Sequence, residues 1–401
     1  MGSAVTEWLL QNREKIEKGV DIIGQASEVL AVTVGQLHPV LEAVFRASAE
    51  LLSNPEGKEA QYLTEQFSKI NEKLEDIQAE LNQISLELQK TSMNKQNFDR
   101  EAQMISQYEK FQEFVNAKNN FKEKKKEKFL SHFENTDADM NLDSLYYAVT
   151  GENTSGDPML ETVVATEQRS RRAVEDFCAS LKKLFVVGII AAMGYASLKE
   201  GQVGDETVKK WQERMEDVEN RMKAAVDDCT KNFAEQAKQD MEGQLKEKPG
   251  SVNIDFTKSL LDMLVKKYDW VSWSLRVFSD TERNFIFNCL AGKNYHGSAG
   301  NPDLQNHFDV ITNNNIKVVI SFCVEPKPID KELIQKQTER QKLKGNMVDV
   351  AQSLREGLPN YLVHAISRYK EVENRILPET TSVKLQQKDK IFHCHLLSTD
   401  L

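Results

Sequence analysis

Residues 181–201 read LKKLFVVGIIAAMGYASLKEG, and this stretch decides which folds are open to the chain. From Leu184 to Leu198 no side chain carries a charge, although the whole chain is 28% charged. These 15 residues would rise about 22 Å as a helix, against about 30 Å for the hydrocarbon core of a bilayer. We therefore expect a helix too short to be a good permanent membrane span, which must be covered in water.

A second apolar tract, residues 22–52, is the expected cover. It is apolar nearly all round, which is typical of a buried helix. Its charged residues Glu28, Glu42 and Arg46 argue against a constitutive membrane span, because each would cost about 2.5–3.5 kcal/mol at mid-membrane. Pro39 predicts either one bent helix or two helices joined near residues 37–39.

The two apolar tracts leave two alternatives open. In the first, which we favour, they form the central layer of a helical bundle, because short uncharged helices are more often core than membrane. In the second, the later tract is a concealed membrane-active element that is released when the bundle opens. The candidate membrane-active residues are Leu184, Phe185, Val187, Gly188, Ile189, Ile190 and Met193.

The sequence after residue 57 carries a heptad pattern, which predicts a long amphipathic helix that continues to about Phe133. The seam packs either inside the chain or in a homodimer through residues 63–88. We favour the intramolecular alternative, because the chain offers its own long partner helices. The seam residues are Leu63, Phe67, Ile70, Leu74, Ile77, Leu81, Ile84 and Leu88.

Glycine and proline are scarce, at 18 and 9 residues, so long helices are expected. We predict a mainly α fold: an elongated bundle of long antiparallel helices with a small antiparallel β-sheet in the C-terminal third. The expected regions are 1–56 (apolar N-terminal helices), 57–134 (long heptad-patterned helix), 135–249 (loop plus a long αα-hairpin, 159–199 and 205–246, containing 184–198) and 250–401 (α+β).

Alternation of apolar and polar residues predicts the strands of the last region. After a helix at 257–267 we expect strands at 271–277, 284–290 and 316–324, a long helix at 330–374 with a kink at Pro359, and a final hairpin at 382–397.

The composition excludes several classes of function. A net charge of −10 argues against nucleic acid as a partner. Five scattered cysteines without a C-x-x-C pair indicate reduced thiols and a cytoplasmic location. No motif for phosphate binding, metalloprotease, hydrolase or kinase chemistry occurs, so we expect no enzyme, no catalytic or metal-binding residue and no cofactor. His393-Cys394-His395 is a tight cluster of metal-ligand types, and we interpret it as ordinary strand residues.

Two further features concern membranes. The N-terminal MGSAVT fits the pattern M-G-x-x-x-[ST], which makes Gly2 a candidate lipidation site and peripheral membrane association an alternative location. The basic run from Lys122 to Lys128 is suited either to anionic lipid or, as we favour, to a solvated helix face. The partners we expect are an unidentified protein and transient membrane contact.

Several stretches together resemble the rapunzel proteins of bony fishes and the related cephalotoxin-like proteins. They are KGVDIIGQASEVLAVTVGQLHPVLEAVFRASAELL, the heptad block, SLYYAVTGENTSGDPMLETVV, the apolar helix and YDWVSWSLRVF. The resemblance covers most of the chain in the same order. It implies a non-enzymatic vertebrate protein of skeletal and fin development, with some members in innate immune regulation. The layout of long helices is also similar to α-helical pore-forming toxins, by architecture alone.

Overall fold

The computed structural model divides the chain into two compact units, Met1–Lys231 and Asn232–Leu401, which we call the helical unit and the C-terminal unit. Each is described by itself. The structure describes residues 4–23, 34–81, 93–152, 156–200, 204–247, 250–279, 296–300, 306–325, 327–341, 346–367, 372–377, 382–387 and 390–396.

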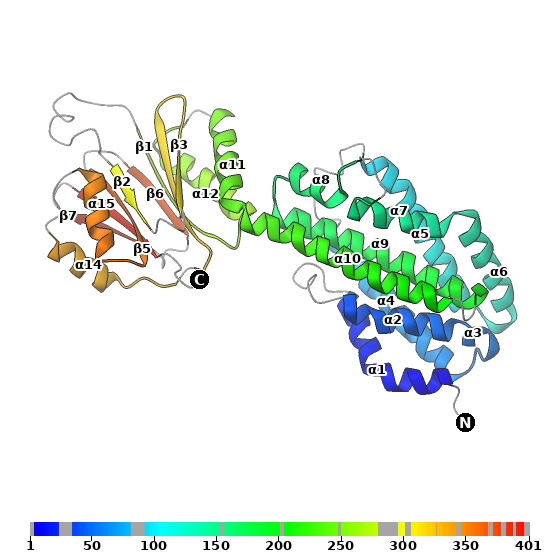
Figure 1. Ribbon diagram of the computed structural model, residues 1–401. Helices are drawn as coiled ribbons and strands as arrows, with labels where there is room; N and C mark the ends of the chain where they lie inside the picture. Colours follow the sequence, from blue (N-terminus) through cyan, green and yellow to red (C-terminus); the bar gives the residue numbers. More distant parts are fainter. Residues whose placement is uncertain are drawn as a thin grey trace. The chain divides into compact units, whose positions relative to one another are not determined.

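The described part of the helical unit is built from helices (Figure 1), as its apolar periodicity predicts. They are α1 (Ala4–Ile23), α2 (Val34–Ser48), α3 (Glu50–Ser53), α4 (Lys58–Leu81), α5 (Met93–Val115), α6 (Asn119–Asn135), α7 (Ala138–Thr150), α8 (Met159–Thr166), α9 (Arg171–Tyr195) and α10 (Gly204–Lys231). A π-helical turn, Ala196–Glu200, extends α9.

The heptad seam packs inside this unit. Its residues Leu63, Phe67, Ile70, Leu74 and Ile77 are buried in α4, which contacts α1, α2 and α9. This burial favours the intramolecular alternative over a homodimer. The last three seam positions, Leu81, Ile84 and Leu88, lie outside the described side chains.

Three boundaries in the helical unit differ from the prediction. Pro39 lies inside α2, so a helix junction at 37–39 is wrong; it is the sixth residue of the helix, where the missing N–H forfeits a single early hydrogen bond. The heptad helix does not run unbroken to Phe133, because Asn116, Ala117 and Lys118 separate α5 from α6. The expected helix 159–199 is likewise divided, into α8 and α9, by a turn in which Gln168 and Arg169 have positive φ.

The C-terminal unit combines helices with two four-stranded antiparallel sheets, ordered β3-β4-β1-β6 and β2-β5-β8-β7. Its elements are α11 (Phe233–Glu247), α12 (Ile254–Lys267), β1 (Ser272–Ser279), β2 (His296–Ala299), β3 (His307–Ile311), β4 (Ile316–Cys323), α14 (Lys331–Arg340), α15 (Met347–Glu356), β5 (Tyr361–Ser367), β6 (Val372–Leu377), β7 (Ser382–Gln387) and β8 (Lys390–Leu396).

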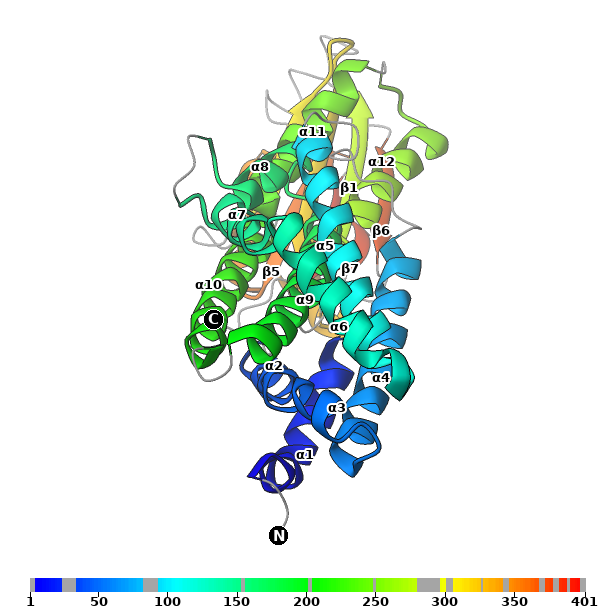
Figure 2. The same ribbon diagram turned by 90° about the vertical axis from the view of Figure 1, so that its right-hand side faces the viewer.

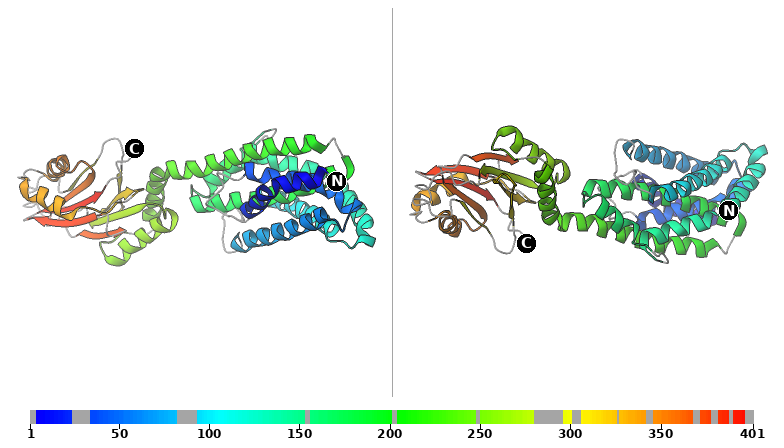
Figure 3. Two further views of the ribbon diagram at one scale, coloured as in Figure 1. Left: turned by 90° about the horizontal axis from the view of Figure 1, so that it is seen from below. Right: turned by 90° about the horizontal axis from the view of Figure 1, so that it is seen from above.

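These elements form four layers, helix, sheet, sheet and helix (Figure 3). Trp273, Leu275 and Val277 of β1 pack with residues of α11 and α12. The next residue, Phe278, packs with Val319 of its own sheet and with Ile366 of the facing sheet. The outer face of the second sheet packs on α14 and α15. The alternation of β1 therefore serves two buried faces rather than one buried and one solvated face.

The prediction of a mainly α fold with antiparallel β-structure in the C-terminal region is confirmed. The strand predictions at 271–277, 316–324 and 382–397 correspond to β1, β4 and the pair β7–β8. The predicted strand 284–290 lies outside the described residues. The long helix 330–374 is wrong: α15 ends at Glu356, and after Pro359 the chain forms β5 and β6.

Candidate functional site

The apolar stretch forms the second half of α9, which lies in the middle of the helical unit (Figure 2). Helices α2, α4, α5, α7, α8 and α10 all contact it. Because α2 belongs to the apolar tract at 22–52, its contact with α9 confirms that this tract covers the uncharged stretch at 184–198. Every candidate membrane-active residue is buried: Leu184, Phe185, Val187, Gly188, Ile189, Ile190 and Met193.

Two glycines let neighbouring helices approach α9 closely. A Cβ atom on Gly188 would lie 2.6 Å from Met104 Cε and 2.7 Å from Leu142 Cδ1. A Cβ atom on Gly194 would lie 2.7 Å from Cδ2 and Cζ of Phe111. These distances are far below van der Waals contact, so the small residues of α9 are required by packing within the unit.

Helix Arg171–Lys199 also meets the length and composition of a membrane span: it has 29 residues, and its most apolar window of 18 residues has a mean hydropathy of 1.7. However, 78% of its most apolar window is buried. A buried core helix and a concealed membrane helix pass the same test, so this helix is the candidate functional element of the unit.

One cation is buried within this apolar setting. Lys182 of α9 is 4% exposed, and its Nζ donates a hydrogen bond of 3.0 Å to the backbone carbonyl of Ile22 at the end of α1. Burial lowers the pKa of Lys182 to about 8 from its ordinary value of 10.5, and the nearby Glu219 carboxylate offsets part of this effect. The helical unit thus keeps an amine where its charged form is disfavoured.

We expect Lys182→Met to stabilise the helical unit at pH 7. The native state holds the proton less tightly than the unfolded chain, so the unfolding free energy of the wild type rises as pH increases from 8 to 10.5. At about 1.4 kcal/mol per pKa unit, the unfolding free energy of the wild type rises by about 3 kcal/mol over this pH range. Urea unfolding of both proteins at several pH values should show their difference shrinking by this amount; a constant difference would contradict it.

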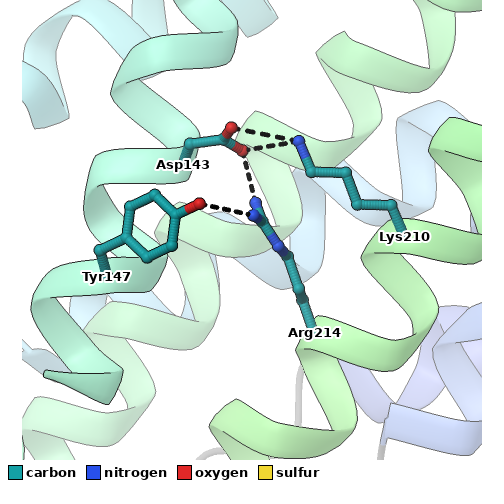
Figure 4. Close-up of polar contacts among 4 residues, drawn as sticks. All are labelled: Asp143, Tyr147, Lys210 and Arg214. Atoms are coloured by element: carbon teal, nitrogen blue, oxygen red, sulfur yellow. Dashed lines mark hydrogen bonds and ion pairs between the residues drawn. The ribbon is translucent and has the colours of Figure 1, made fainter. Parts of the chain in front are cut away.

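Polar residues join α7 to α10 on the outside of the bundle. Asp143 accepts hydrogen bonds from Lys210 Nζ at 2.9 and 3.1 Å and forms an ion pair with Arg214. Arg214 also donates to the hydroxyl of Tyr147 at 3.1 Å (Figure 4). We call these four residues, Asp143, Tyr147, Lys210 and Arg214, the α7–α10 polar cluster.

Arg214 is the centre of this cluster. Its guanidinium lies 4.5 Å from the ring centroid of Tyr146 and 5.1 Å from that of Trp211, and its side chain is 16% exposed. Lys210, by contrast, is 42% exposed. A desolvated guanidinium held by a carboxylate and aromatic faces contributes more than an exposed amine.

We therefore expect Arg214→Ala to lower the unfolding free energy by about 2 kcal/mol, since it removes a charged hydrogen bond and the aromatic contacts. The matched change Lys210→Ala should cost under about 1 kcal/mol, because Lys210 is more exposed and Asp143 retains Arg214. Urea unfolding followed by circular dichroism measures both. Equal losses would show that the cluster has no dominant member.

The basic run in α6 is largely used within the helical unit. Lys122 is buried and its Nζ donates to the backbone carbonyl of Val115 at 2.9 Å, which satisfies the end of α5. Lys125 pairs with Glu113, and Lys126 pairs with Glu123. The interpretation as a solvated helix face therefore fits Lys124 and Lys128, which are exposed, but not Lys122, which is buried.

The remaining sequence predictions have different outcomes. Gly2 lies outside the described residues. Cys178, Cys229 and Cys323 are buried, and burial raises the pKa of the Cys178 and Cys229 thiols to about 12. His393-Cys394-His395 does lie in a strand, β8. Among the described residues, no group of three or more His, Cys, Asp or Glu is placed to hold a metal ion. The α7–α10 polar cluster was not predicted, because its two helices are separated by about 70 residues in sequence.

Comparison with known proteins connects the chain to one family. Residues 53–251 match the family model of the cephalotoxin-like middle helical domain. Protein rapunzel of Danio rerio is 26% identical over 225 residues, which cover 55% of this chain and 97% of that protein. No solved structure matches. The matched domain contains α9, the α7–α10 polar cluster and the glycines that allow close packing.

Proposed function

Because the chain is similar to the rapunzel and cephalotoxin-like proteins, we propose that it is a non-catalytic, intracellular interaction protein in skeletal and fin development. One observation supports the interaction mechanism: the apolar helix α9 serves as the core of the helical unit, with 78% of its most apolar window buried. The apolar stretch at 184–198 then serves only to pack the helical unit. The protein acts through its surface on a protein partner in the cytoplasm.

The developmental role is tested by disrupting the gene in the animal of origin and staining the skeleton of the fins. We expect altered fin skeleton, restored by the wild-type chain. Restoration by Arg214→Ala should be weaker than by Lys210→Ala if the role needs the intact helical unit. A normal skeleton in the disrupted animals would contradict the proposal.

A second candidate function is conditional membrane insertion. It is favoured by the length of helix Arg171–Lys199 and by the mean hydropathy of 1.7 of its most apolar window. In this mechanism α9 leaves the bundle and enters a bilayer when its cover opens. Because α10 packs on α9 and is tied to α7 through Asp143 and Arg214, loosening the polar cluster should make opening easier.

Vesicle leakage separates the two candidates. Purified full chain is mixed with dye-loaded vesicles of zwitterionic and anionic phospholipid at pH 7 and pH 5. Insertion predicts leakage that is greater for Arg214→Ala than for Lys210→Ala, with a protease-protected fragment covering residues 171–199. The interaction mechanism predicts no leakage and no protected fragment with any of these proteins.

A further inference from the structure

An open cavity lies on the helical unit where α7, α8 and α10 contact one another. Its volume is about 460 Å³, within the usual range of about 300–1,000 Å³ for sites that bind small molecules. Most of the side chains around it are apolar or small. The apolar lining is made by Val149, Pro158, Leu160, Val164, Ala224 and Ala225.

Small side chains leave this space open, and a tight turn fixes its wall. Ala224 and Ala225 present only methyl groups where a larger side chain of α10 would fill the cavity. Gly151 ends α7 with a φ of 76°, in the left-handed region that favours glycine. A Cβ atom on Gly151 would lie 2.6 Å from Cγ of Pro158, so glycine is also what lets Pro158 lie so close. The start of α8 is therefore held in one position at the cavity wall.

An ion pair forms one side of the polar rim. Arg169 follows α8 with a φ of 55°, which is uncommon for a residue other than glycine. Its backbone N–H donates to the carbonyl of Val164 at 2.9 Å, and its Nε donates to the Asp228 carboxylate at 3.0 Å. Because Arg169 and Asp228 neutralise each other, we assign this pair a role in shaping the cavity rather than in binding a ligand.

Arg221 of α10, on the rest of the rim, uses only part of its hydrogen-bonding capacity. Its Nε donates to Asp217 at 3.1 Å, and its Nη2 lies 4.0 Å from Glu152, which is beyond hydrogen-bonding distance. A guanidinium has five N–H donors. Among the described residues, none accepts a hydrogen bond from the two Nη groups of Arg221. The side chain is 39% exposed, so a ligand can reach these donors from the cavity.

We propose that this cavity binds a single-chain amphiphile with an acidic head, of the fatty-acid class. The alkyl chain lies on the apolar lining, and the carboxylate accepts two hydrogen bonds from the Nη groups of Arg221. Bidentate pairs of arginine and carboxylate are among the stronger hydrogen bonds in proteins. Of the two carboxylates that line the cavity, Asp228 is neutralised by Arg169, whereas Glu161 is exposed and repels the acidic head.

The site is tested by calorimetric titration of the full chain with decanoate, below the concentration at which it forms micelles. One decanoate should bind per chain. Arg221→Gln should weaken binding at least tenfold, and Glu161→Gln should tighten it severalfold because it removes the repelling charge. Arg13→Gln is the matched control: Arg13 also pairs with a carboxylate four residues away, but it lies in α1 and outside the cavity lining, so the affinity should not change.

Two further measurements separate the apolar part of the site from its polar part. Ala224→Trp changes an exposed position that lines the cavity, so it should abolish decanoate binding while circular dichroism shows native structure. Decanol and decyltrimethylammonium, which carry the same chain on a neutral and a cationic head, should bind at least tenfold more weakly than decanoate.

The other outcomes overturn the proposal. If the folded wild type binds no decanoate, or if Ala224→Trp binds it as the wild type does, the cavity is not the site. Equal binding of the three amphiphiles, or an affinity for decanoate that Arg221→Gln leaves unchanged, would show that the acidic head is not recognised. Weaker decanoate binding by Glu161→Gln would assign the wrong charge to the ligand.

Discussion

Gly194→Leu is expected to destabilise the helical unit by more than about 3 kcal/mol, beyond the usual cost of overpacking. Even the Cβ of the new side chain would lie 2.7 Å from two ring atoms of Phe111. Phe111 is fully buried, with its ring centroid 5.3 Å from that of Phe67 and 5.1 Å from that of Phe129. The ring has no space to retreat, so α9 and α5 must separate.

Gly243→Leu is the matched control. Gly243 lies in α11, and a Cβ atom there would meet nothing within 4 Å. Both changes replace a helical glycine, which by itself should stabilise the helix by about 0.5–1 kcal/mol. Urea unfolding should therefore show opposite signs for the two variants. A loss of less than about 1 kcal/mol for Gly194→Leu would mean that the packing of α9 is looser than described.

Features that depend on local pattern could be predicted from the sequence. The uncharged run at 184–198 and the apolar tract at 22–52 had to be covered, and their mutual contact follows from their shared lack of charge. The seam from Leu63 to Ile77 was read from its heptad spacing. The alternation around Trp273 was enough to place β1.

Boundaries that depend on competing local signals were predicted less well. The helix expected at 330–374 contains Asn346, whose side chain accepts hydrogen bonds from the backbone N–H groups of Val348 and Asp349 and so starts a new helix. Gly357 and Pro359 then end it, and the following YLVHAIS has the β-branched and aromatic residues of a strand. The prediction of one long helix followed the amphipathic periodicity and passed over the cap at Asn346 and the helix-ending residues Gly357 and Pro359.

The sites themselves depend on contacts that no local pattern contains. Arg214 and Asp143 meet because α7 and α10 pack together, and either residue alone is typical of a solvated helix face. The cavity beside Arg221 likewise exists only because α7, α8 and α10 contact one another.

Trp273→Ala is expected to lower the stability of the C-terminal unit by about 3–5 kcal/mol, because it leaves a large cavity. Trp273 is 1% exposed, its indole N–H donates to the backbone carbonyl of Tyr268 at 3.3 Å, and its ring lies 5.7 Å from that of Phe322 and 6.0 Å from that of Phe233. These neighbours come from β4 and α11, so the truncation removes contacts across a whole layer.

Hydrogen exchange followed by mass spectrometry can assign this loss to one unit. Since the chain forms two compact units, Trp273→Ala should speed exchange in β1, β4 and α12 while leaving α9 as protected as in the wild type. Trp270→Ala is the control, because Trp270 borders the same aromatic rings but is only half-buried and should lose less than half as much. Loss of protection in α9 as well would mean that the two units unfold as one, and the assignment of separate cores would then be wrong.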